Sequence, residues 1–254
     1  MKLKQSIRYQ LADFIGPVIV YYGIVAAVHI LFFLLHHFVN PNMMYLGGGI
    51  SGFIMVFLFI CGLCSFHDNL PMHLQNGVSR KTMYTAWLAV TGIVSAFMAV
   101  ADTVLAVLID LLDLPIWGYG SANLFLTLFN LDSLAFGQTL VNTLFSIPFS
   151  FVLLALAMTL GYFIVVFLYR LPLKLRIVVG VCAGFVLFCG VPGVKIIDAN
   201  LLGGGLRAFF YQYVEPVLAF IWENPFARMG TWAVEAVALS AVTWLILRRT
   251  TVLR

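Results

Sequence analysis

The chain has 254 residues, of which 63 % are hydrophobic and only 9 % are charged, and its formal net charge is +4. A soluble domain carries about 25 % charged residues, so this composition excludes an ordinary soluble protein and indicates a membrane protein with no room for a separate soluble domain. The basic residues are dispersed along the chain and do not predict a nucleic-acid partner.

Six long apolar runs predict six transmembrane helices, because each approaches the length that a helix needs to cross about 30 Å of hydrocarbon. They cover about residues 14–38, 44–66, 83–112, 137–168, 177–194 and 226–247. We therefore predict an all-α membrane protein that forms a single transmembrane domain over residues 1–254. A seventh span over residues 206–224 is disfavoured because it would place Arg207, Glu215 and Glu223 in the membrane.

The basic residues predict the orientation of these spans. With six spans both termini lie on one side, and that side holds every Lys and Arg except Lys195, Arg207 and Arg228. Positive charge marks the cytoplasmic side, so we expect both termini in the cytoplasm. The short basic loop over residues 169–176 is expected to contact anionic membrane lipid.

Residues 1–13 predict a basic amphipathic helix that lies along the inner leaflet. Its apolar face consists of Leu3, Ile7, Leu11 and Phe14, while Lys2, Lys4 and Arg8 lie elsewhere on the wheel. Gly16-Pro17 is expected to separate this helix from the first span. The alternative is a charged N-terminus whose periodicity is fortuitous.

The loop between the second and third spans predicts a short helix that lies across the membrane surface. Asp68 or Asn69 is suited to cap its start, Asn76-Gly77 to end it, and Ser79 to cap the next span. Such a helix would present Leu70, His73 and Leu74 to a partner. The alternative is a passive connection.

The outer segment over residues 195–225 is broken by Gly203–Gly205 and by Glu215-Pro216. Two short helices that enter the outer interface and return would fit this pattern. The residues that we expect to form this outer cap are Gly204, Tyr211, Glu215 and Pro216.

His29, Asp102 and Glu235 are the ionisable residues that lie deepest in the spans, at similar depths. We expect them to meet near the middle of the membrane, either as a polar substrate route or proton relay, or as a structural hydrogen-bonded cluster. The Cys61/Cys64 pair is interpreted as ordinary buried thiols. The sequence carries no Gly-x-Ser-x-Gly, His-Glu-x-x-His or phosphate-loop motif, so we predict no catalytic, cofactor or metal site.

This layout resembles the type-2 export permeases of bacterial ABC transporters. The likeness spans the whole chain, and its most specific element is the turn Asn76-Gly77-Val78-Ser79-Arg80-Lys81. The resemblance implies a bacterial cell-membrane permease that pairs as a dimer, favoured as a homodimer, with ATP and magnesium bound on separate ATPase subunits. It implies that the loop helix couples to the ATPase. The residues assigned to this coupling are Asp68, Leu70, His73, Leu74, Asn76, Arg80 and Lys81.

Permeases of this kind export amphipathic substrates, and the resemblance favours a peptide, including an antimicrobial or toxin peptide. Two other classes stay open. One is a membrane scaffold or immunity protein without transport, and the other is an intramembrane enzyme built on His29, Asp102 and Glu235. Co-purification with an ATPase separates these classes.

Overall fold

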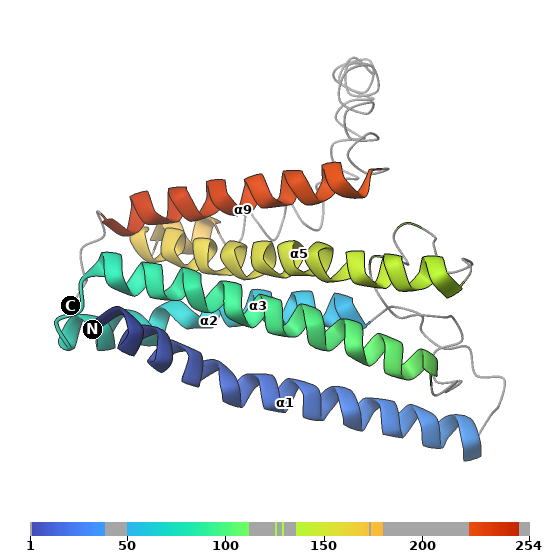
Figure 1. Ribbon diagram of the computed structural model, residues 1–254. Helices are drawn as coiled ribbons and strands as arrows, with labels where there is room; N and C mark the ends of the chain where they lie inside the picture. The colour runs from blue at the N-terminus through green and yellow to red at the C-terminus, as the bar shows by residue number, and fades with distance from the viewer. Residues whose placement is uncertain are drawn as a thin grey trace, which may run out of the picture.

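The computed structural model describes residues 2–38, 50–111, 125, 129, 136–172, 174–179 and 224–248. This part of the chain is helical and contains no strand, which confirms the all-α prediction. Its long helices are α1 (Lys2–Phe38), α2 (Ile50–Gln75), α3 (Arg80–Leu111), α5 (Phe136–Arg170) and α9 (Pro225–Arg248), and they form an elongated bundle (Figure 1).

Four of these helices are long and apolar enough to cross a membrane. The segments are Leu3–Val28, Arg80–Leu105, Asn142–Arg170 and Pro225–Arg248, and α2 adds the shorter apolar segment Gly52–Phe66. These lengths and compositions fit a transmembrane protein. Of the predicted fifth span, residues 177–179 are described and helical, and the rest lies outside the described residues, as does nearly all of the outer segment.

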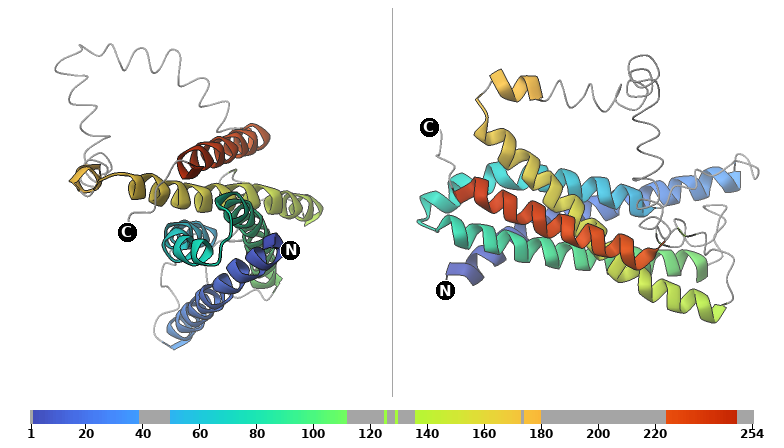
Figure 2. Two further views of the ribbon diagram at one scale, coloured as in Figure 1. Left: turned by 90° about the vertical axis from the view of Figure 1, so that its left-hand side faces the viewer. Right: turned by 90° about the horizontal axis from the view of Figure 1, so that it is seen from above.

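α5 lies between α9 on one side and the α2–α3 pair on the other, and α1 lies beyond α3 (Figure 2). The closest approach joins α2 and α5 at two glycines. A Cβ atom added to Gly62 would overlap the carbonyl oxygen of Met158, and one added to Gly161 would overlap the carbonyl oxygen of Phe59. Small residues allow helices to touch backbone to backbone, which is how helices associate where apolar burial gives little driving force.

The structure corrects the expected break after residue 13, because α1 is one continuous helix through Pro17. A proline removes one backbone donor and bends a helix, but the hydrogen bonds on both sides can hold it together. In apolar surroundings a full break would leave several more backbone groups without partners. The N-terminal segment is therefore the first part of α1 and not a separate interfacial helix.

The expected loop helix is likewise the end of the second span, since α2 runs without interruption to Gln75. Asn69 does not cap a new helix; its side-chain amide donates to the carbonyl of Ser65 at 2.7 Å, within α2. The predicted stop is present, because Gly77 has a φ of 64° and the Val78 amide donates to the carbonyl of His73 at 2.9 Å. Ser79 caps α3 as expected: its Oγ accepts from the Thr82 amide at 3.2 Å.

Candidate functional site at the basic end of the bundle

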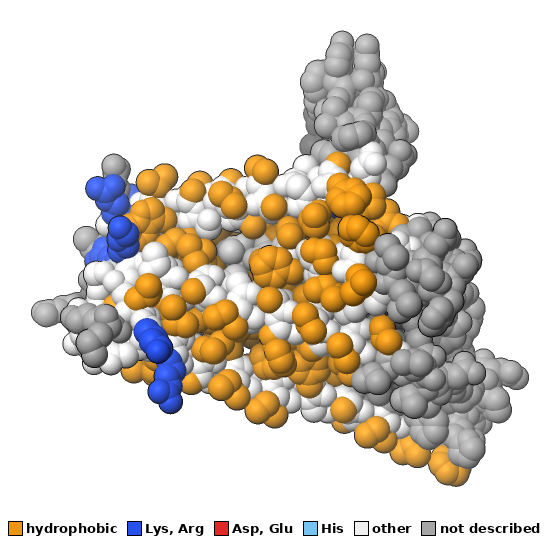
Figure 3. All heavy atoms as spheres, viewed as in Figure 1, with side chains coloured by type: hydrophobic (Ala, Val, Ile, Leu, Met, Phe, Trp, Pro, Cys, Tyr) orange, Lys and Arg blue, Asp and Glu red, His pale blue; other side chains and the backbone are white. Residues whose placement is uncertain are grey.

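The basic side chains gather at one end of the bundle. α1 and α3 begin there and α5 and α9 end there, so charges far apart in the sequence become neighbours (Figure 3). They are Lys4, Arg8, Arg80, Lys81, Arg170, Lys174, Arg176 and Arg248. Among the described cations Arg228 is the exception, since it lies near the start of α9. This asymmetry is the pattern that the positive-inside rule associates with a cytoplasmic face.

The turn between α2 and α3 is exposed at this end. Gln75, Asn76, Gly77, Ser79 and Lys81 are exposed, and the residues between them are half-buried. We call residues 75–81 the basic-end turn. Arg80 anchors it from below, because its Nη1 donates to the carbonyl of Leu247 in the last turn of α9 at 3.4 Å. A cation at this position also complements the negative end of the α9 dipole.

A buried imidazole ties three helices together directly beneath the turn. Gln10 of α1 donates from Nε2 to Nε2 of His73 in α2 at 2.8 Å and to the carbonyl of Met83 in α3 at 3.4 Å. Ser6 Oγ lies 3.3 Å from the same imidazole nitrogen. We call Ser6, Gln10, His73 and Met83 the His73 clasp. Since buried polar groups are costly without partners, the clasp favours one arrangement of the three helix ends.

The orientation of the Gln10 amide assigns the state of the imidazole. With the amide nitrogen facing Nε2 of His73, the ring accepts the hydrogen bond, which requires a neutral ring with its proton on Nδ1. Burial lowers the pKa of His73 below its ordinary value, and the carboxylate of Asp13 opposes this shift. Tyr9 adds an edge-to-face ring contact at 5.9 Å. The hydrogen bond from Gln10 to His73 therefore forms only while His73 is neutral.

Acidification is expected to loosen the clasp. Folding lowers the pKa of His73, so His73 binds a proton more readily when the three helix ends are apart than when they are packed. The stability that the neutral imidazole gives to the packed helix ends is therefore lost as the pH falls below the ordinary pKa of 6.5. Amide hydrogen exchange in the first turns of α1 should be faster at about pH 5 than at about pH 7.5, beyond the intrinsic pH effect. His73→Gln should remove this difference. Equal protection of the wild-type junction at both pH values would contradict the assignment.

The residues that were expected to face a partner differ in their exposure. Leu70 and His73 are buried within the chain, each 4 % exposed, and so do not form part of an exposed surface. Asn76 and Lys81 are exposed and Arg80 is half-buried. The side chains of Asp68 and Leu74 lie outside the described residues.

Ser6 and Gln10 were not predicted to belong to a site. The expected apolar face of the N-terminal helix is not its most buried one: Leu3 is 44 % exposed, whereas Gln10 is 1 % exposed. Ser6, Gln10 and Phe14 follow each other at intervals of one helical turn, and this spacing is the signal that could have found them. Their burial depends on the distant polar partner His73, which no local pattern reveals.

The three deeply placed ionisable residues do not share one environment. Asp102 is buried in α3, whereas Glu235 is exposed on α9, and the side chain of His29 lies outside the described residues. Asp102 interacts electrostatically with Tyr21 and Tyr22 of α1. The described residues contain no group of three His, Cys, Asp or Glu side chains that could hold a metal ion.

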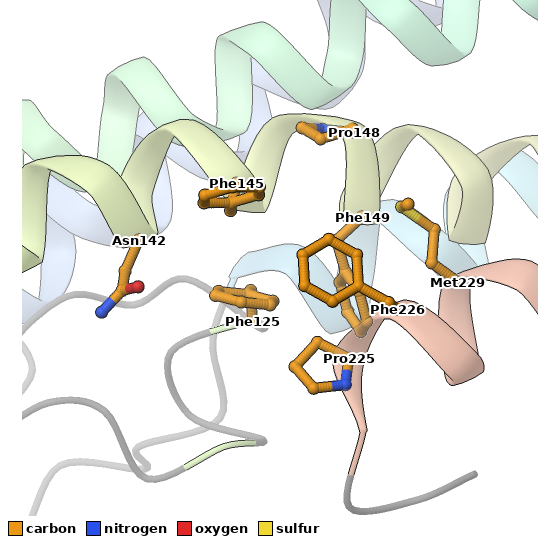
Figure 4. A pocket seen from close by; sticks show the side chains of 8 residues that line it. All are labelled: Phe125, Asn142, Phe145, Pro148, Phe149, Pro225, Phe226 and Met229. Atoms are coloured by element: carbon orange, nitrogen blue, oxygen red, sulfur yellow. The ribbon is translucent and has the colours of Figure 1, made fainter.

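An aromatic pocket of about 210 Å³ lies at the opposite end, between α5 and the start of α9 (Figure 4). It is lined by Phe125, Asn142, Phe145, Pro148, Phe149, Pro225, Phe226 and Met229. Arg228 is buried beside this aromatic cluster, 5.1 Å from the ring centre of Phe129 and 5.8 Å from that of Trp232. The expected outer cap residues Gly204, Tyr211, Glu215 and Pro216 lie outside the described residues.

Comparison of the chain with protein-family models, with curated proteins and with solved structures finds no match. The class that the fold defines is a helical protein that fits a transmembrane role, with the described basic side chains other than Arg228 at one end.

Proposed function

We propose that this chain is the transmembrane subunit of an ATP-driven exporter, and that the basic-end turn docks on a separate ATPase subunit. The observation that carries the proposal is the turn itself: an exposed, polar and basic connection whose two helices are linked to α1 by the His73 clasp and to α9 by Arg80. A force that the ATPase applies to this turn is transmitted to α2 and α3 together. A flexible loop would not transmit it to both helices.

In this proposal the chain works as a pair of copies, with homodimers favoured, in a bacterial cell membrane. The partner ATPase binds ATP and magnesium, and this chain supplies no catalytic group. The exported substrate is amphipathic, with a peptide favoured. The aromatic and methionine-containing pocket between α5 and α9 supports this choice, because such surfaces adapt to apolar side chains.

Charge reversal of the basic-end turn tests the docking. Lys81→Glu combined with Asn76→Asp should weaken capture of a co-expressed ATPase subunit by about tenfold or more, as expected for central interface residues. ATP hydrolysis that depends on the complex should fall in parallel. The matched control is Lys174→Glu, which reverses an exposed charge at the same end outside the turn.

Two results would count against the proposal. If no ATPase co-purifies with the wild-type chain from its native membrane, a scaffold or immunity role without transport takes its place. If the ATPase binds the double variant and the control equally well, docking occurs elsewhere on the chain.

A further inference from the structure

One buried face of α3 carries a line of side chains that are able to form hydrogen bonds. It consists of Tyr84, Trp87, Thr91, Ser95 and Asp102, which fall within about 80° of the helix circumference. None of the five is more than 4 % exposed. We call this set the α3 polar stripe. It begins near the basic end and extends about 27 Å along the helix, close to the thickness of a hydrocarbon core.

Three polar atoms in the middle of the stripe have no protein partner. Within the described part of the chain, Trp87 Nε1, Thr91 Oγ1 and Ser95 Oγ form no hydrogen bond. For Thr91 and Ser95 this is unusual, because the hydroxyl of a serine or threonine in a helix commonly donates to the carbonyl one turn back. Thr103 on the same helix does so, donating to Ala99 at 2.9 Å. Buried polar groups that lack a protein partner are normally satisfied by ordered water.

Helices packed against α3 add further hydroxyls of the same kind. Tyr21 and Tyr22 of α1 and Ser150 of α5 have buried hydroxyls that find no partner among the described atoms. Both tyrosines interact electrostatically with Asp102, and the side chain of His29, also on α1, lies outside the described residues. No acidic, basic or histidine residue occurs in α2 over residues 50–66 or in α5 over residues 136–169, and Glu235 of α9 is exposed.

We propose that water molecules bound along the α3 polar stripe connect the basic end of the bundle to Asp102, and that Asp102 takes up and releases a proton through them. Uptake transfers one proton from a hydronium ion to a carboxylate oxygen, giving a neutral carboxylic acid and water. A buried acid in a membrane span is costly when charged, which makes the neutral form accessible. Hydroxyls at intervals of one to two turns supply both donors and acceptors for the water molecules. This proposal is independent of ATPase docking.

Infrared spectroscopy of the full chain in lipid nanodiscs tests the proposal. On transfer from H₂O to D₂O, the carbonyl band of a protonated carboxyl group should shift. This band should disappear in Asp102→Asn and persist in Glu235→Gln. Thr91→Val and Ser95→Ala remove hydroxyls without a partner, and each should slow the exchange of the Asp102 carboxyl proton for a deuteron by about tenfold. The doubly substituted chain should exchange more slowly still. Thr103→Val is the matched control, because it changes a buried hydroxyl that is already bonded within the helix.

The results test the proton site and the water path separately. A band that survives in Asp102→Asn, or the absence of any exchangeable carboxyl band, would overturn the assignment of the proton to Asp102. Exchange at the same rate in Thr91→Val, Ser95→Ala and Thr103→Val would overturn the water path. Should Asp102→Asn fail to fold, Asp102→Glu keeps the acid and should move the band to a new frequency. An unmoved band then also contradicts the proposal.

Discussion

Gly161→Ala is expected to separate α2 from α5 and to lower the free energy of unfolding by about 3 kcal/mol. The new methyl group would overlap the carbonyl oxygen of Phe59 and lie 3.1 Å from the amide nitrogen of Leu63, both of which belong to backbone that cannot turn aside. Gly62→Ala should have a similar effect, because its methyl group would overlap the carbonyl oxygen of Met158. Unfolding by sodium dodecyl sulfate in mixed micelles measures both changes.

Gly52→Ala provides the matched control for this prediction. It makes the same substitution on α2, the helix that carries Gly62, but no atom lies within 4 Å of the added Cβ position. Alanine favours a helix over glycine by about 1 kcal/mol, so this variant should be as stable as the wild type or more so. If Gly161→Ala behaves like Gly52→Ala, the two helices do not touch at their backbones.

Trp87→Ala should destabilise the bundle by about 3 kcal/mol or more, since it opens a cavity at the junction of three helices. The indole stacks on Tyr162 of α5 with 3.8 Å between ring centres and on Tyr84 with 5.8 Å. Tyr84 in turn stacks on Trp244 of α9 at 5.6 Å and donates to the carbonyl of Ser240 at 2.6 Å. The loss therefore weakens the contacts of α3 with both α5 and α9.

Two further variants distinguish lost packing from a general effect of shortening an aromatic side chain. Trp87→Phe keeps a ring against Tyr162 and should retain most of the stability. Phe97→Ala changes a side chain of α3 that is 57 % exposed and should shift the free energy of unfolding by less than about 1 kcal/mol. A loss in Trp87→Ala no larger than that in Phe97→Ala would show that the stack does not hold the bundle.

Helix type and the turn between α2 and α3 were accessible from the sequence because their signals are local. Apolar runs of sufficient length predicted an all-helical chain, and the glycine at position 77 and the cap at Ser79 marked the turn. The stop and the cap depend on residues that are neighbours in the chain. For the same reason, the exposure of Asn76 and Lys81 agrees with the loop pattern.

Features that depend on the three-dimensional surroundings of a residue could not be predicted from its neighbours in the chain. Pro17 predicts a break by its local chemistry, yet it does not interrupt α1, because an apolar environment penalises every released backbone group. The contact between Gln10 and His73 joins residues 63 positions apart. The depth of Asp102 and Glu235 could be counted along the sequence, but the direction in which each side chain points depends on how α3 and α9 pack.

The glycine contact between α2 and α5 has a mechanical consequence. α2 and α5 pack along much of their length, and their backbones approach closely at Gly62 and Gly161. Sliding one helix past the other would drive side chains into the opposing backbone at this place, so a tilt about it is the easier motion. Gly62 lies near the centre of α2, with arms of about 20 Å to Gln75 and about 18 Å to Ile50. A tilt of α2 about this place would therefore move its two ends by similar amounts in opposite directions.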